Sequence, residues 1–246
     1  MSENTSTEKI SLPGAIILGS VIIAIGIIFA FGGRGVNQGG APIGQDQATQ
    51  AMDIFAAAEA IGADVDTLTA CLENGENQIA KIEADIDNAR LTGGTGTPHS
   101  IILARDGRTV LVQGAQEQAV WEGILGALAE GQSSFIASGD RVFTIESPES
   151  ELSRNIMAVR DADHILGNPD AEYTIIEYSD MECGFCKRLH GTLHTIVDRR
   201  NDVNWVYRQF PILSQNSVVK SLASECIAEE KGNDGFWAYI DILMAV

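Results

Sequence analysis

The stretch 173–187, YTIIEYSDMECGFCK, decides the fold, because an apolar run leads directly into two cysteines spaced three apart. The run predicts a strand, and the residues after Cys186 have the pattern of a helix. A strand ending here delivers Cys183 to a helix N-terminus, where unpaired N–H groups and the helix dipole stabilise a thiolate. Such a thiolate attacks disulfides, and Cys186, one turn on, is placed to resolve the mixed disulfide. The motif therefore predicts a thiol-disulfide exchange site.

Composition limits the class of protein. The 246 residues are 45% hydrophobic, enough for one large domain or two small ones. The net charge of −18 argues against a nucleic-acid partner, because phosphate contacts need clustered Lys and Arg. We therefore expect a globular protein with an acidic, solvated surface.

The segment 12–31, LPGAIILGSVIIAIGIIFAF, contains about twenty residues without a charge. Its length suits a transmembrane helix, so we expect an anchor there, with 1–11 as a cytoplasmic N-terminus. A cleaved signal peptide is the alternative, although its apolar region is normally shorter. Lys9 and Arg34 flank the segment and leave almost no positive-inside bias. Redox-active cysteines suit a compartment where disulfides persist, so we place the folded part on the extracytoplasmic, periplasmic side of a bacterial cell membrane.

The rest of the chain separates into periodic segments. Residues 32–50 are rich in Gly, Gln, Asn and Ala and predict a flexible tether. Beyond it the pattern predicts helices over 51–62, 64–72, 78–91, 116–130, 187–200 and 217–231. Strands are expected at 99–103 and 109–112, joined by an Asp-Gly turn, and at 173–178 and 203–208. Residues 132–160 have a mixed pattern and are interpreted as a linker, in which VFTI (142–145) is either a short strand or part of the linker.

Several motifs resemble one family. The segments are DHILGNPDA (163–171), IIEYSDMECGFCK (175–187), WVYRQFP (205–211), ASECIA (223–228) and GFWAY (235–239). Together they look like the first half of a DsbA-like thioredoxin-fold oxidoreductase, up to its inserted helical region. Residues 63–131, which include Gly96-Thr97-Pro98 and the 99–112 hairpin, resemble the second half of that family.

The two halves are thus in reversed order, with 51–131 as the second half and 161–246 as the first. This order implies an α/β thioredoxin-like fold with an inserted helical region, circularly permuted and preceded by one transmembrane helix. The halves can close within one chain, as a monomer, or exchange between chains in a domain-swapped dimer. We favour closure within one chain.

The resemblance also assigns site residues. Pro98 matches a cis proline that lies against the redox pair, and Thr97 would present its backbone to an extended substrate. Gly184 and Phe185, between the cysteines, would also meet the substrate. Glu177 matches a buried carboxylate that passes protons during exchange. Without the resemblance, Thr97 and Pro98 read as an ordinary loop, and Glu177 is as well explained by an outward-facing strand carboxylate.

The remaining cysteines leave alternatives open. In related proteins, cysteines at positions such as Cys71 and Cys226 form a structural disulfide; two buried free thiols are the alternative. A zinc site formed by the cysteines is another alternative, and His190 and His194 form an i, i+4 pair that can bind metal. We expect redox chemistry with no metal and no cofactor.

The sequence thus predicts an enzyme, a membrane-anchored extracytoplasmic thiol-disulfide oxidoreductase that forms or reshuffles disulfides. Its partners would be exported proteins with cysteines and a membrane or soluble redox partner. A disulfide reductase or isomerase, a redox-inactive binding module, and a truncated or rearranged reading frame remain alternatives.

Overall fold

A computed structural model describes residues 45–245, with side chains from Asp53 onward. The chain divides into two units, 1–52 and 53–246, and the second contains the candidate site. The predicted N-terminus (1–11), the anchor (12–31) and residues 32–44 of the tether lie outside the described residues. Among the residues that are described, no helix combines the length and hydrophobicity that a membrane span requires.

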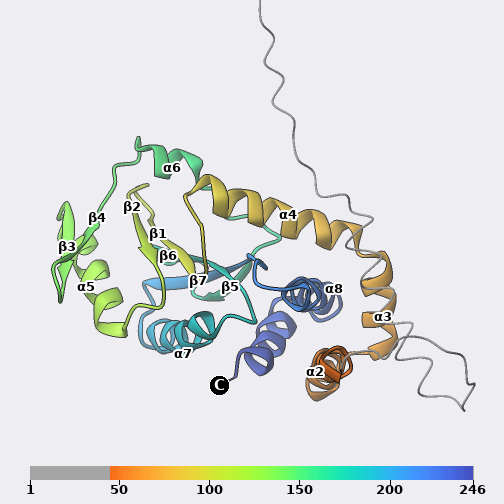
Figure 1. Ribbon diagram of the computed structural model, residues 1–246. Helices are drawn as coiled ribbons and strands as arrows, with labels where there is room; N and C mark the ends of the chain where they lie inside the picture. The colour runs from red at the N-terminus through yellow and green to blue at the C-terminus, as the bar shows by residue number, and fades with distance from the viewer. Residues whose placement is uncertain (1–44, 246) are drawn as a thin grey trace, which may run out of the picture. The chain divides into compact units, whose positions relative to one another are not determined.

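A five-stranded mixed sheet forms the centre of the second unit, with the strand order β2-β1-β6-β7-β5 (Figure 1). Strands β6 and β7 are parallel, and the other neighbouring pairs are antiparallel. The two parallel strands are buried along nearly their whole length, which is why their sequences are largely apolar. The strands are β1 (His99–Ala104), β2 (Thr109–Gln113), β5 (His164–Gly167), β6 (Tyr173–Ser179) and β7 (Val203–Gln209).

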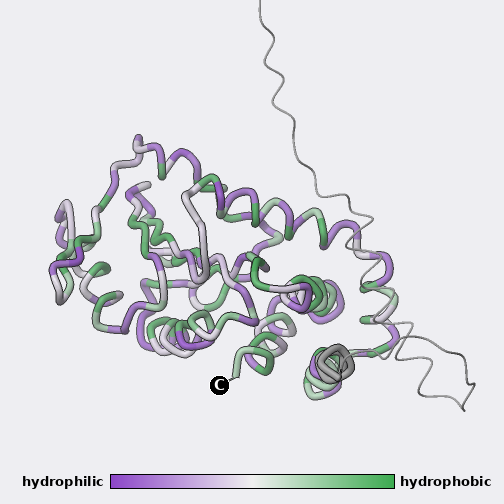
Figure 2. The backbone as a smooth tube through the Cα atoms, viewed as in Figure 1, coloured by the Kyte–Doolittle hydropathy of each residue, from purple (hydrophilic) through white to green (hydrophobic). Residues whose placement is uncertain are grey.

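Helices cover both faces of the sheet. Helix α4 lies along one face, and α5 and α7 lie along the other (Figure 1). Helix α4 alternates between hydrophilic and hydrophobic residues along its length (Figure 2), as expected of a helix with one buried side. The longer helices are α2 (Gln45–Ala60), α3 (Val65–Asn74), α4 (Glu76–Leu91), α5 (Gln118–Ala129), α7 (Gly184–Arg199) and α8 (Gln215–Met244).

Successive side chains of β6 point to opposite faces of the sheet. Ile176 and Tyr178 point to the side of α4, where they pack in one buried cluster with Ala89. The intervening residues, among them Glu177, point to the opposite side, which α7 covers. The aromatic residues Trp205, Phe210, Phe236 and Trp237 are buried in the core.

The two segments interpreted as halves of a fold contribute to one sheet within this chain. Strand β1 pairs with β6, with His99 opposite Tyr178 and Ser100 opposite Glu177. This arrangement, with helices on both faces of a central sheet, is consistent with the thioredoxin-like fold that the sequence predicts.

Four features differ from the sequence-based expectations. Residues 132–160 are not a featureless linker, because they contain β3 (Ser134–Ala137), β4 (Arg141–Thr144) and α6 (Glu151–Asn155). Residues 45–50 of the predicted tether belong to α2, and β5 was not predicted as a strand. Helix α8 continues beyond Lys231 to Met244, across a non-helical residue at Gly232.

Local chemistry explains this hairpin, of which the sequence offered only a short strand at 142–145 as an alternative. Gly139 and Asp140 both have positive φ and form its turn. The rings of Phe135 and Phe143 lie opposite each other with centroids 6.4 Å apart. Each strand has only four residues, too few to produce a clear alternation in the sequence.

Candidate redox site

Cys183 lies at the junction between β6 and α7. It is the N-cap of α7 and Cys186 lies in the first turn, so both thiols are close to the positive end of the helix. Asp180 fixes the preceding turn: its carboxylate accepts hydrogen bonds from Glu182 N, at 2.9 Å, and from the backbone N–H groups of Ile212 and Leu213. The loop after β7 is thereby held next to the cysteines.

Both cysteines are free thiols and both are buried. Cys183 is 6% exposed, and its Sγ–H donates to the carbonyl oxygen of Thr97 at 3.4 Å. The Thr97–Pro98 peptide bond is cis. The structure therefore brings Thr97, which lies 86 residues earlier in the chain, against Cys183.

Cys186 has a different environment, because it is fully buried behind the first turn of α7. Burial raises the pKa of the Cys186 thiol, and the nearby Glu177 carboxylate raises it further. A thiol of this kind holds its proton, whereas Cys183 at the helix N-terminus is the one that can meet a substrate. The position of Cys183 suits a nucleophilic cysteine, and the buried, protonated Cys186 suits a resolving cysteine.

Glu177 is completely buried, so the outward-facing alternative for it is wrong. It lies between Ser100 on β1 and Tyr207 on β7, and Ser179 donates a 2.8 Å hydrogen bond to its Oε1. Burial raises the pKa of Glu177 to about 8, although the hydrogen bond from Ser179 lowers it. A carboxyl group with such a pKa can take up and release a proton near neutral pH.

Other polar groups are buried around Glu177. Burial raises the pKa of the Tyr207 phenol, and the charges of Glu177 and Cys186 raise it further. Among the described residues, neither the Tyr207 hydroxyl nor Glu177 Oε2 nor Ser100 Oγ has a hydrogen-bond partner. The carboxyl group therefore lies in a small polar region enclosed by the sheet and α7, a region that sequence reasoning did not predict.

An apolar surface adjoins the thiols. Phe185, between the cysteines, is 58% exposed and stacks under the guanidinium of Arg188, whose Cζ lies 4.3 Å from the ring centroid. Ile212 and Leu213 are also exposed, on the loop that Asp180 holds. Gly184, the first residue of α7, has no heavy atom within 4 Å of the position that a Cβ would occupy. Exposed apolar side chains at this position can contact an extended peptide.

Cys71 on α3 and Cys226 on α8 form a disulfide across 155 residues of sequence. The alternative of two free thiols at these positions does not hold in the structure. Because both sulfurs are bonded to each other, neither is free to complete a metal site with Cys183 and Cys186. The disulfide links the 51–131 segment to the 161–246 segment.

A second polar cluster was only partly expected. His190 and His194, the pair noted in the sequence, both contact Asp241 of α8. Asp241 was not identified from the sequence, because it lies 51 residues after His190. Another unforeseen group is the buried ion pair between Arg208 and Asp163, at 2.8 Å.

Comparison with known proteins gives a consistent result for part of the chain. Residues 160–245 match the family described as Thioredoxin. Similar proteins include Na⁺/H⁺ antiporter NhaA 1 of Mycolicibacterium gilvum (strain PYR-GCK), 34% identical over 94 residues, or 36% of this chain and 15% of the antiporter. Na⁺/H⁺ antiporter NhaA 1 of Salinispora arenicola (strain CNS-205) is 30% identical over 86 residues, or 35% of this chain and 13% of the antiporter.

The chain thus spans only a small part of the curated relatives that it matches. A further one, Na⁺/H⁺ antiporter NhaA 1 of Mycobacterium sp. (strain KMS), is 40% identical over 53 residues, which is 21% of this chain and 9% of the antiporter. No solved structure matches the chain. The Thioredoxin match, together with the central sheet, supports a thioredoxin-like fold and is consistent with oxidoreductase activity.

Proposed function

We propose that this protein is a DsbA-like thiol-disulfide oxidoreductase that forms or reshuffles disulfides in exported proteins. The observation that carries the proposal is the pair of free thiols at the N-terminus of α7, with Cys183 next to Thr97 and Cys186 next to a buried Glu177. The fold alone does not specify an activity, and the thiol pair with its buried carboxyl neighbour is what supports thiol-disulfide exchange.

In the oxidising direction the pair begins as a Cys183–Cys186 disulfide. A substrate thiolate attacks Cys183 Sγ, so a mixed disulfide forms and Cys186 leaves as a thiolate. Cys186 then takes a proton, which Glu177, with its pKa of about 8, can supply. A second substrate thiolate attacks the substrate sulfur of the mixed disulfide and releases the thiolate of Cys183. The substrate loses two electrons, the pair gains them, and a redox partner must reoxidise the pair.

The surface beside the thiols suggests how a substrate is held. The Thr97 backbone, which already accepts a hydrogen bond from Cys183, can pair with an extended segment of substrate. Exposed Phe185 and Leu213 would contact its apolar side chains. Such contacts favour unfolded or partly folded cysteine-containing proteins over compact ones.

We further propose that the fold is circularly permuted. The strands of 161–246 run β5, β6, β7, and those of 51–131 supply β1 and β2 on the far side of β6. The Cys71–Cys226 disulfide then links the two segments within one monomeric chain, with 132–160 as the connection. A domain-swapped dimer would make the same strand pairs between two chains.

The membrane location is part of the proposal as well. The apolar segment 12–31 would anchor the chain in the cell membrane and hold the redox domain on the extracytoplasmic side, where disulfides persist. The similar antiporters share at most 15% of their length with this chain, so we do not propose antiport for it.

The direct test is turnover of a reduced, unfolded model substrate by the purified full chain, with oxidised glutathione present to reoxidise the Cys183–Cys186 pair. We expect catalysed disulfide formation that Cys183→Ser abolishes. When Cys186→Ser is given the disulfide-bonded form of the substrate instead, the Cys183 thiolate should attack that disulfide, release one substrate thiol and accumulate a mixed disulfide, visible on a non-reducing gel, because no Cys186 is present to resolve it. The matched control, Cys71→Ser with Cys226→Ser, should retain exchange, because these sulfurs lie on α3 and α8 and not at the N-terminus of α7.

Two results would contradict the proposal. If the chain shows no thiol exchange in either direction while it remains folded, the redox-inactive binding module is the better account. If exchange persists in Cys183→Ser, another sulfur is the nucleophile. Catalysed reduction without oxidation would instead identify the chain as a reductase, the alternative within the same chemistry.

A further inference from the structure

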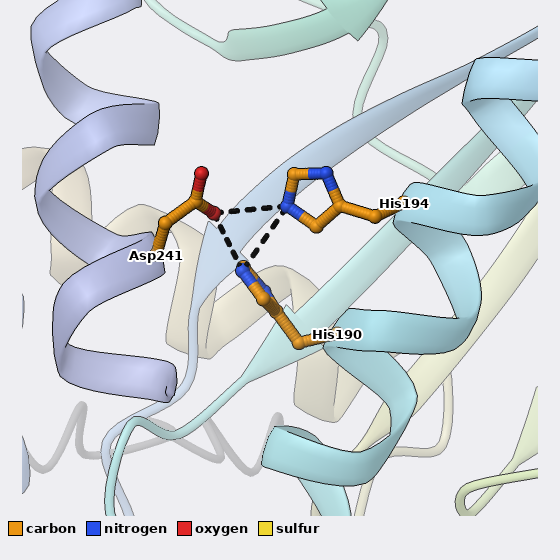
Figure 3. Close-up of side chains that lie close together, drawn as sticks. All are labelled: His190, His194 and Asp241. Atoms are coloured by element: carbon orange, nitrogen blue, oxygen red, sulfur yellow. Dashed lines mark hydrogen bonds and ion pairs between the residues drawn. The ribbon is translucent and has the colours of Figure 1, made fainter. Parts of the chain in front are cut away.

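Three side chains from two helices converge on one point (Figure 3), and none of them is a cysteine of the redox pair. His190 and His194 lie one turn apart on α7, and Asp241 faces them from α8. Oδ1 of Asp241 is 2.7 Å from Nε2 of His190 and 2.9 Å from Nε2 of His194, and the two Nε2 atoms are 3.2 Å apart. We propose that these three atoms bind one Zn²⁺ ion, with water completing its coordination.

The distances between the donor atoms fit such an ion. A triangle with sides of 2.7, 2.9 and 3.2 Å has its corners about 1.7 Å from its centre. Zinc bonds to imidazole nitrogen and carboxylate oxygen are about 2.0–2.2 Å long. An ion just above the plane of the three atoms can therefore contact all of them, with its far side open to water. Tetrahedral coordination requires the donors to separate by a few tenths of an ångström.

The donor set selects the kind of metal. Two imidazoles and one carboxylate suit Zn²⁺ and similar transition metals, whereas Mg²⁺ and Ca²⁺ prefer oxygen ligands alone. Burial lowers the pKa of His190, which favours the neutral form that binds metal. The hydrogen bond with Asp241 raises the pKa of His194, so protons compete for this ligand, and the exposed Asp198 acts on it in the same direction.

The surroundings hold the ligands in place while leaving access to solvent. Trp205 packs edge-on against His190 and His194, with ring centroids 5.0 and 5.4 Å away, and Trp237 packs against His194. Nδ1 of His190 has no hydrogen-bond partner among the described residues, so packing orients this ring. The side chain of Asp241 is 44% exposed, which gives an ion a path to the site and room for water.

Binding would have a structural consequence. The ligands join α7, which begins at the redox cysteines, to the part of α8 that follows the break at Gly232. An ion bound only by the folded state raises the unfolding temperature as its concentration rises. The proposed zinc site would thus link the two helices. The proposal does not depend on the proposed redox function.

The test uses the full chain, purified without a histidine tag and stripped of metal with a chelator. Because thiols also bind zinc, the background is Cys183→Ser with Cys186→Ser. Isothermal titration with ZnCl₂ should give one ion per chain, and Co²⁺ should give the visible spectrum of a site with imidazole and carboxylate ligands and no thiolate charge-transfer band. His194→Gln and Asp241→Asn should each weaken zinc binding at least about tenfold.

Controls separate loss of ligands from loss of fold. Asp106→Asn, in an exposed ion pair of the β1–β2 turn, should bind zinc as the parent does. Each ligand variant should unfold cooperatively without metal, yet show no increase in unfolding temperature when zinc is added, in contrast to the parent. The proposal is overturned if the parent binds no zinc, or if His194→Gln and Asp241→Asn bind it as tightly as the parent. In that case the three side chains form only a hydrogen-bonded cluster of one carboxylate and two imidazoles.

Discussion

Replacing Glu177 with Gln tests the environment that we assign to the redox site. The wild-type carboxyl is fully buried, and its pKa of about 8 lies well above the ordinary value of 4.5. Gln has nearly the same shape but carries no charge at any pH. The substitution should therefore leave stability near its wild-type value in acid and increase it in alkali.

The sign and size of the effect follow from proton linkage. Between the unfolded pKa of 4.5 and the folded pKa of about 8, folded Glu177 holds a proton that the unfolded chain has released. Wild-type stability consequently falls as pH rises through this window. Each pH unit changes the unfolding free energy by about 1.4 kcal/mol, so the stability difference between Glu177→Gln and wild type should grow by roughly 3 kcal/mol from about pH 5.5 to about pH 8.

The assay is equilibrium urea unfolding of the reduced wild-type chain and the variant at a series of pH values. Taking the difference between the two proteins removes the pH dependence that every group other than residue 177 contributes equally to both. Parallel stability profiles, with a difference independent of pH, would show that Glu177 has an ordinary pKa in the folded state. That result would refute its burial and its role as the proton carrier for Cys186.

Two further predictions concern stability. Asp163→Asn leaves the fully buried Arg208 without its carboxylate and should cost about 3–5 kcal/mol in urea unfolding, whereas Asp106→Asn, in an exposed pair, should cost less than about 1 kcal/mol. A loss below about 1 kcal/mol for Asp163→Asn would contradict the buried pair. Removing the disulfide with Cys71→Ser and Cys226→Ser should cost about 2–5 kcal/mol, because it closes a 155-residue loop. Equal stability with and without these cysteines would mean that the bond does not form.

The parts of the fold that follow from short-range pattern could be predicted. The strand, turn and helix around Cys183 are predicted by an apolar run followed by a helical run, and the structure places β6 and α7 there. The β1–β2 hairpin follows from its Asp-Gly turn, in which Gly107 has positive φ. Asp64, a residue type typical of helix starts, is the N-cap of α3 and accepts a hydrogen bond from Thr67 N.

The features that could not be predicted from the sequence depend on packing between residues far apart in the chain. The alternation along β6 puts Glu177 and Ile175 on one face, but only the position of α7 determines that this face is closed to water. Asp241 joins His190 and His194 because α8 continues past Gly232, where a glycine predicts a helix end. Strand β5 has four residues and ends at Gly167, so it gives no periodic signal of its own.

The central claim is that Cys183 and Cys186 form a reversible redox pair while Cys71 and Cys226 form a stable structural bond. The most direct measurement is equilibration of the full chain in glutathione buffers of defined potential, followed by alkylation and non-reducing peptide mapping. We predict a single chain in which the Cys183–Cys186 bond opens and closes over the range of glutathione buffers, while Cys71–Cys226 stays oxidised. Scrambled or intermolecular pairs, with no reversible step between Cys183 and Cys186, would contradict the account.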